Sequence, residues 1–166
     1  MAWHLNIVAI KKPYTKVRDY LDVLTIKESN VGFEKATSNI EDFTVSSTFI
    51  NGFTLIFDPH CRIFHNREMY NKIFENEEIH LFQILQTPGY KNVIEAKNNY
   101  RLTGIKEFKQ ELIKRNIEIR DKKDGEIYAW QLFDEIIFGK QSQGINDDLW
   151  NAKFDLWELS SLSFLK

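Results

Sequence analysis

Apolar and polar residues alternate over several short stretches of the chain, which is the pattern of β-strands with one buried face. Residues 3–10 begin with such an alternation and end in an apolar run, so we predict a strand there. Further along, Asn51-Gly52 separates two runs of β-branched and aromatic residues. Both residue types adopt the positive φ angles that a two-residue turn needs, so residues 43–57 are predicted to form a β-hairpin.

A second hairpin is predicted over residues 79–97. Two apolar runs flank a Thr-Pro-Gly-Tyr sequence, in which Pro88-Gly89 suits the centre of a type II turn. With the turn at this position, Glu95 on the returning strand is expected to lie opposite Phe82.

Elsewhere apolar residues recur at helical spacing. Helices are predicted over 14–24, 68–74, 104–115, around 132–137 and from 146 to 157. Thr103 is the predicted cap of the third helix. The residues predicted to form its buried stripe are Ile105, Phe108, Leu112 and Ile113.

Two segments have no decisive period. Residues 25–42 suit a loop with a short strand, and residues 126–130 suit either a strand or the start of a helix. Gly139 follows the fourth predicted helix and is a suitable residue to end it.

Hairpins and helices are interspersed along the chain, and this order predicts an α+β fold. We expect a mostly antiparallel or mixed sheet, built from hairpins 43–57 and 79–97 and packed against several helices. The length of 166 residues, with 43% hydrophobic residues, suits one domain with its own core. Residues 1–166 are therefore predicted to form a single globular domain.

The charge of the chain gives it no general attraction to nucleic acid or anionic membranes. Lys and Arg number 22 against 24 Asp and Glu, so the net charge is −2. Between residues 106 and 123 basic residues alternate with acidic ones, which indicates a solvated face and argues against a phosphate-binding track. The single Cys and the lack of a run of roughly 20 apolar residues favour a cytoplasmic protein without membrane contact. Abundant Ile, Lys, Asn and Phe are typical of AT-rich bacterial or phage genomes.

Several catalytic motifs are absent from the sequence. No Gly-x-Gly-x-x-Gly, Gly-x-Ser-x-Gly, His-Glu-x-x-His or calcium-loop pattern occurs. Residues 139–144 come nearest to a phosphate loop, but Ile145 and Asn146 stand where Lys and Ser or Thr are needed. We therefore expect no cofactor.

A divalent metal is the alternative to that expectation. Asp58, His60, Cys61 and His65 follow the first hairpin closely, and all four side chains are of types that bind transition metals. Their spacing matches no zinc motif. A turn at Asp58-Pro59, a buried Cys and two surface histidines explain the same residues without a metal.

The segment 93–97, Val-Ile-Glu-Ala-Lys, pairs an acid with a Lys two residues later on a predicted strand. Alternate residues on a strand share a face, so Glu95 and Lys97 could act together on a metal ion and a water. This segment resembles the acidic-x-Lys half of the PD-(D/E)xK nuclease family. The resemblance implies an upstream acid, for which Glu77 or Glu78 is the candidate, although the family's Pro-Asp pair occurs here only in reverse order. The other interpretation is an exposed salt pair.

Aromatic residues and acids gather toward the C-terminus. Trp150 and Trp157 lie among Asp147, Asp148 and Asp155. Such aromatic residues commonly form a core, but Trp is also enriched at the centres of protein interfaces. A partly exposed Trp bordered by carboxylates would recognise a basic protein partner.

Together these observations favour a small, soluble, non-enzymatic protein that acts by binding another protein, as an immunity or inhibitor protein does. The alternative is a metal-dependent hydrolase or nuclease that uses Glu95 and Lys97, or Asp58, His60 and His65. An assembly subunit is a third possibility, and the sequence leaves the oligomeric state open.

Overall fold

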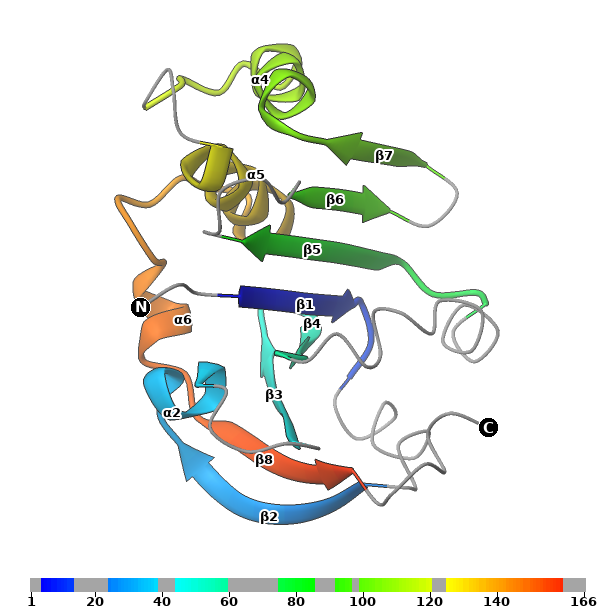
Figure 1. The fold of residues 1–166 in the computed structure, drawn as a ribbon, viewed down its shortest axis with the longest axis vertical. Coiled ribbons are helices and arrows are strands. Elements are labelled where there is room, and N and C mark those ends of the chain that lie inside the picture. The colour runs from blue at the N-terminus through cyan, green and yellow to red at the C-terminus, as the bar shows by residue number, and fades with distance from the viewer. Residues whose placement is uncertain are drawn as a thin grey trace.

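The computed structural model is organised around one eight-stranded sheet with strand order β2-β8-β3-β4-β1-β5-β6-β7 (Figure 1). It describes residues 4–13, 24–38, 44–59, 75–85, 92–96, 99–120 and 125–159. The strands are β1 (His4–Ile10), β2 (Leu24–Val31), β3 (Thr44–Ile50), β4 (Phe53–Phe57), β5 (Ile79–Leu85), β6 (Val93–Ala96), β7 (Tyr100–Thr103) and β8 (Phe154–Leu159). The helices are α2 (Phe33–Thr37), α4 (Ile105–Lys114), α5 (Gly125–Phe138) and α6 (Asp147–Trp150). Every strand pairing is antiparallel, so the predicted α+β class with an antiparallel sheet is confirmed.

The first predicted hairpin is confirmed as β3 and β4. Ile50 pairs with Phe53, and the two turn residues have the expected positive φ angles, 48° at Asn51 and 84° at Gly52. The Asn51 amide also donates a hydrogen bond of 2.6 Å to the carbonyl of Ile137, near the end of α5. The turn therefore both closes the hairpin and holds a helix.

The second predicted hairpin is present as the antiparallel pair β5 and β6, and its predicted turn at Pro88-Gly89 lies outside the described residues. The register differs from the prediction by one residue, because Leu81 and not Phe82 lies opposite Glu95. The sequence pattern also missed β7, a four-residue strand that adds an outer edge to this hairpin.

One face of the sheet forms the main hydrophobic core. Alternate strand residues such as Ile7, Phe57 and Phe82 belong to it, together with residues from all four described helices. The ring of Phe82 lies 4.9 Å from that of Phe133 on α5, edge to face. Buried side chains of this size contribute roughly 1.5–3 kcal/mol each, so this layer is a major source of stability.

The opposite face of the sheet is buried as well. The intervening residues on the strands include Val8, Ile10, Ile56, Leu81 and Trp157, all nearly inaccessible to solvent. Central strands covered on both faces read as continuous apolar runs. This explains why strict alternation fades in residues 7–10 and 53–57.

The predicted helix over 104–115 is confirmed as α4, but half of its predicted stripe is wrong. Phe108 and Leu112 are buried, whereas Ile105 and Ile113 are exposed. The helix lies over β7 and beside α5 at the edge of the sheet (Figure 1). An edge position buries only a narrow line of residues four apart, which excludes the two isoleucines.

The cap of α4 also differs from the prediction. Gly104 occupies the cap position with a φ of 84°, and Thr103 precedes it. The Glu107 carboxylate accepts hydrogen bonds from the backbone and hydroxyl of Thr103. The side chain that closes this end of the helix is therefore an acid in the first turn.

Residues 126–130, left open by the sequence, belong to α5. This helix runs without interruption from Gly125 to Phe138. Gly139 follows with a φ of 66°, and its N–H donates to the carbonyl of Glu135, as expected of a residue that ends a helix.

The predicted helix from 146 to 157 is wrong beyond its first turn. Only Asp147–Trp150 is helical, and Phe154–Leu159 forms strand β8 between β2 and β3. Pairing with two distant strands outweighs the local helical period there.

In the region 25–42, expected to be a loop with a short strand, residues 25–31 belong to the longer strand β2 and residues 33–37 to the helix α2, while residues 39–42 lie outside the described residues. Of the predicted helix 14–24, residues 14–23 lie outside the described residues, and Leu24 opens β2. The predicted helix 68–74 lies wholly outside them. Among the described helices, none has the length and apolar character to cross a membrane.

Candidate functional site

The predicted metal site is only partly within the described residues. Asp58 is buried directly after β4, and its N–H donates a hydrogen bond of 2.8 Å to the carbonyl of Asn6. His60, Cys61 and His65 lie outside the described ranges. Within those ranges, no three His, Cys, Asp or Glu side chains gather as metal ligands. Metal binding at this segment stays a prediction.

The structure does not bring Glu78 and Glu95 together. Glu95 lies opposite Leu81, and its carboxylate is 3.3 Å from Arg101. Glu78 instead contacts His80, whose neighbour on the same face is Phe82 in the main core. Because residues 80 and 81 point to opposite faces, the two acids lie on opposite sides of the sheet. Lys97 lies outside the described residues.

Glu78 has a structural contact of its own. Its carboxylate lies 2.7 Å from Nε2 of the buried His80. This hydrogen bond, with the nearby charge of Lys11, holds the pKa of Glu78 below its ordinary value of 4.5. Because Lys11 directly follows β1 and Glu78 directly precedes β5, their ion pair of 3.6 Å connects the end of β1 to the start of β5.

The acidic and aromatic residues near the C-terminus divide between two places. Trp157 is only 2% exposed, and its Nε1 donates a 2.7 Å hydrogen bond to the hydroxyl of Ser47. Trp157 is therefore part of the sheet packing and is not accessible to a partner. Asp155 lies opposite Ser47 on this same face of the sheet, whereas its neighbour Phe154 points into the main core.

Asp155 borders a shallow groove of about 370 Å³ between β2, β8 and β3. Its other lining residues are Ser29, Asn30, Ser47, Thr48, Phe49, Lys153 and Phe154. The groove opens where the pairing of β2 with β8 shifts between Glu28 and Val31, and Asn30 has a φ of 64° there. A bulge of this kind bends a strand away from its neighbour.

Trp150 is the exposed aromatic residue of this set. Its side chain is 43% exposed, and its ring lies 5.4 Å from that of Phe33 on α2. Phe33 is buried and packs edge to face on Phe57 and Phe154. Trp150 therefore rests on a fixed aromatic base while one part of its indole faces solvent.

Asp147 and Asp148 are exposed in the first turn of α6 and make no ion pair with any described residue. The Asn146 side chain caps this turn by accepting hydrogen bonds from the backbone of Asp148 at 2.8 Å and Leu149 at 3.3 Å. Leu149 is fully buried in the main core. We name Asp147, Asp148 and Trp150 the α6 surface.

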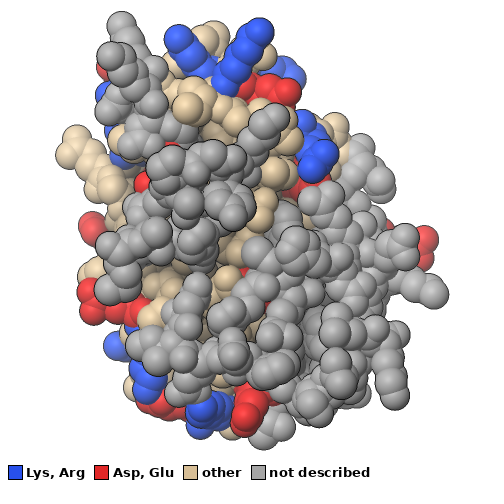
Figure 2. All heavy atoms as spheres, viewed as in Figure 1, with Lys and Arg blue, Asp and Glu red and all other residues tan. Residues whose placement is uncertain are grey.

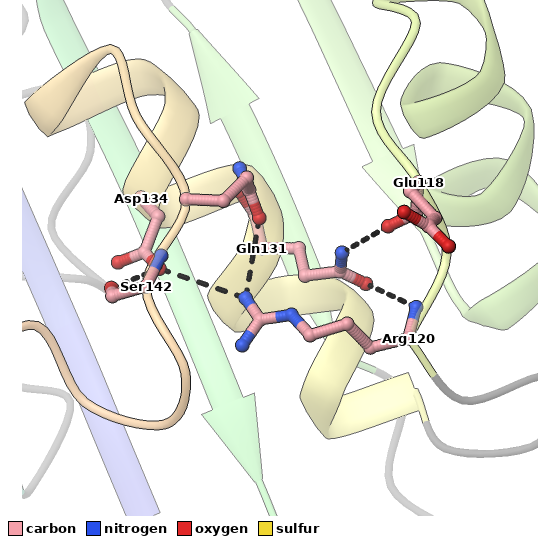
Figure 3. A network of polar contacts seen from close by, with 6 residues as sticks. Glu118, Arg120, Gln131, Asp134 and Ser142 are labelled. Carbon is pink, nitrogen blue, oxygen red and sulfur yellow. Dashed lines mark hydrogen bonds and ion pairs between the residues drawn. The ribbon is translucent and has the colours of Figure 1, made fainter.

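A polar network anchors the loop that leads into α6 (Figure 3). The buried Asp134 of α5 accepts hydrogen bonds from the hydroxyl of Ser142 at 2.6 Å and from its backbone at 3.1 Å. Arg120 approaches the same carboxylate oxygen at 3.7 Å. Burial raises the pKa of Asp134 above its ordinary value of 3.8, although the hydrogen bonds from Ser142 oppose this.

Gln131 joins three segments within the same network. Its side-chain amide donates a hydrogen bond of 2.7 Å to the backbone carbonyl of Glu118. Its side-chain oxygen accepts a hydrogen bond of 3.4 Å from the backbone N–H of Arg120. Its backbone carbonyl accepts a 2.9 Å hydrogen bond from Gln141, which in turn accepts from Arg120. These hydrogen bonds hold Gln141 and Ser142, which begin the loop between α5 and α6, against α5.

Sequence reasoning missed this network. Asp134 stands inside an apolar helical run, which was the one available signal, because a buried acid requires partners. Its partner Ser142 follows the helix and could not be assigned without the fold.

Comparison of the chain with protein-family models, with curated proteins and with solved structures gives no significant match. The functional interpretation therefore rests on the geometry of the site.

Proposed function

We propose that this protein is a non-enzymatic binding protein that acts on a basic protein partner through the α6 surface, in the manner of an immunity or inhibitor protein. The observation that carries the proposal is the half-exposed Trp150 held on Phe33 beside two exposed acids. We also infer that the protein forms one cytoplasmic domain, in keeping with its single Cys.

Trp150 has the properties of a residue that dominates an interface. Trp is enriched among the few residues that supply most of the binding free energy. The Trp150 ring already packs on Phe33, so this side chain would lose little further conformational entropy when a partner binds.

Asp147 and Asp148 supply the selectivity. Exposed carboxylates without ion pairs to described residues attract basic surfaces and repel acidic ones. Such charges at the border of an interface act mainly on the association rate and on its dependence on salt.

The test begins with the immobilised protein and a cell extract, from which it retains candidate partners. Each retained protein is then purified and titrated against the wild type and against Asp147→Lys/Asp148→Lys. The matched control is Glu118→Lys/Glu158→Lys, which reverses two exposed acids elsewhere.

The proposal predicts that the α6 variant binds roughly tenfold or more weakly, while the control binds like the wild type. Circular dichroism establishes that both variants fold. Equal affinity for all three proteins, or no partner retained by the wild type, contradicts the proposal.

A further inference from the structure

Helix α4 carries a basic and apolar strip on its outer face. Ile105 and Ile113 are 48% and 58% exposed on this face. The exposed Lys106, Lys109 and Lys114 lie between and beside them. We name these five residues the α4 strip.

The two acids of α4 do not neutralise this strip. Glu107 is directed back to Thr103, and Glu111 forms a 2.8 Å ion pair with Arg115. None of the three lysines of the strip makes an ion pair with a described residue. Figure 2 shows Lys and Arg side chains at the top of the molecule, where Figure 1 places α4. The strip is thus locally positive although the chain has a net charge of −2.

The α6 surface has the complementary chemistry. It joins two carboxylates that make no ion pair with a described residue to an exposed indole, as the α4 strip joins lysines to exposed isoleucines. We propose that the α4 strip of one copy of this chain docks on the α6 surface of a second copy. The inference rests on the α6 surface of the proposed function and adds a second occupant for it.

The contact is between molecules because the two surfaces lie apart within one molecule. Helix α4 lies over β7 at one end of the sheet order, whereas α6 lies beside α2, near β8 and β2 at the other end (Figure 1). Two different surfaces that meet in this way form a head-to-tail contact, which leaves a free surface at each end of the pair.

A second copy suits the strip better than nucleic acid or a lipid surface. Burial of exposed isoleucines against an aromatic side chain is favourable, whereas phosphates offer them no such apolar contact. A helix that binds in a membrane surface needs a continuous apolar face, but here lysines interrupt the two isoleucines. Because each surface is small, we expect weak, concentration-dependent association.

Sedimentation velocity over a range of protein concentrations, at low and high salt, tests the inference. The wild type should associate at low salt and less at high salt. Lys106→Glu/Lys109→Glu should reduce the association constant roughly tenfold or more, as should Asp147→Lys/Asp148→Lys. The matched control Lys140→Glu/Lys153→Glu reverses two other exposed lysines and should associate like the wild type.

The strongest test is to mix Lys106→Glu/Lys109→Glu with Asp147→Lys/Asp148→Lys. Each variant alone presents like charges on both surfaces, but the mixture again presents opposite charges, so association should return. A wild type that remains monomeric at low salt overturns the inference, and so does a mixture that fails to associate. Binding of the wild type to phosphatidylserine vesicles or to RNA, lost in Lys106→Glu/Lys109→Glu without any self-association, also overturns it.

Failure of this inference is distinguishable from failure of the proposed function. Lys106→Glu/Lys109→Glu leaves the α6 surface intact, so this variant should still bind the purified partner. If it does so while self-association proves absent, only the head-to-tail contact is excluded.

Discussion

Among single residues, Phe33 contributes mainly to stability, whereas Trp150 is proposed to contribute mainly to binding. Phe33 is buried between α2 and the sheet, and its ring also contacts Trp150, the exposed neighbour. Removal of a buried Phe leaves a cavity, whereas removal of a half-exposed Trp mainly removes one ring contact.

We therefore predict different stabilities for two alanine variants. Phe33→Ala should lower the free energy of unfolding by about 3–5 kcal/mol. Trp150→Ala should lower it by only about 1 kcal/mol. Urea unfolding followed by circular dichroism measures both values. Equal losses would mean that Trp150 contributes as much to stability as the buried Phe33.

Asp134 gives a prediction for pH. Burial raises its pKa in the folded state, so the folded protein holds this proton more tightly than the unfolded chain does. The contribution of Asp134 to stability should therefore fall as the pH rises from about 3.8 through the folded-state pKa. In Asp134→Asn this contribution is absent.

Urea unfolding at a series of pH values measures the difference between wild type and Asp134→Asn. The variant should gain stability relative to the wild type as the pH rises through this window. Asp147→Asn, which removes an exposed acid, is the control for the loss of one negative charge. A difference that stays constant with pH would show that burial does not govern Asp134.

At the scale of elements, α6 is a helix of four residues that depends on its cap. Helices this short have almost no stability of their own, because forming the first turn is costly. Asn146 satisfies two backbone donors of this turn, and Leu149 fixes it to the core.

Asn146→Ala should cost about 1 kcal/mol of stability. It should also speed hydrogen exchange at the amides of Asp148 and Leu149, which the Asn146 side chain caps. Asn146→Asp keeps an oxygen acceptor and should restore the protection. Unchanged exchange in the alanine variant would mean that the core contact alone holds α6.

The elements predicted from sequence are those with local signals. Asn51-Gly52 specifies its own turn, and the helical period of residues 105–114 agrees with their position outside the strands of the sheet. Residues 154–159 show the opposite case, since their strand depends on pairing with residues more than 100 positions away in β3. The exposed edge of α4 likewise depends on where the sheet ends.

The candidate site follows the same division. The cluster of Trp and Asp in the sequence pointed to α6, but only the fold separates the exposed Trp150 from the buried Trp157. The Asp134 network joins α5 to residues from two flanking loops, so no local pattern predicts it. Likewise, only the fold separates Glu78, which contacts His80, from Glu95, which lies opposite Leu81 on the other face of the sheet.

At the scale of the whole molecule, the arrangement of charge matters more than its total. The net charge is only −2, yet the acids of α6 and the lysines of α4 lie on separate parts of the structure, and none of them is ion-paired to a described residue. If both a basic partner and a second copy use the α6 surface, each excludes the other. Self-association would then lower the concentration of protein available to the partner.

If Trp150 anchors a protein partner, isothermal titration of the purified partner should distinguish two alanine variants. Phe49 offers the matched control, because it is a similarly exposed aromatic residue in the groove beside β3. Trp150→Ala should raise the dissociation constant roughly thirtyfold or more, as expected for a dominant contact, while Phe49→Ala should leave it unchanged. If Trp150→Ala leaves the dissociation constant at the wild-type value, Trp150 is not the anchor of the partner.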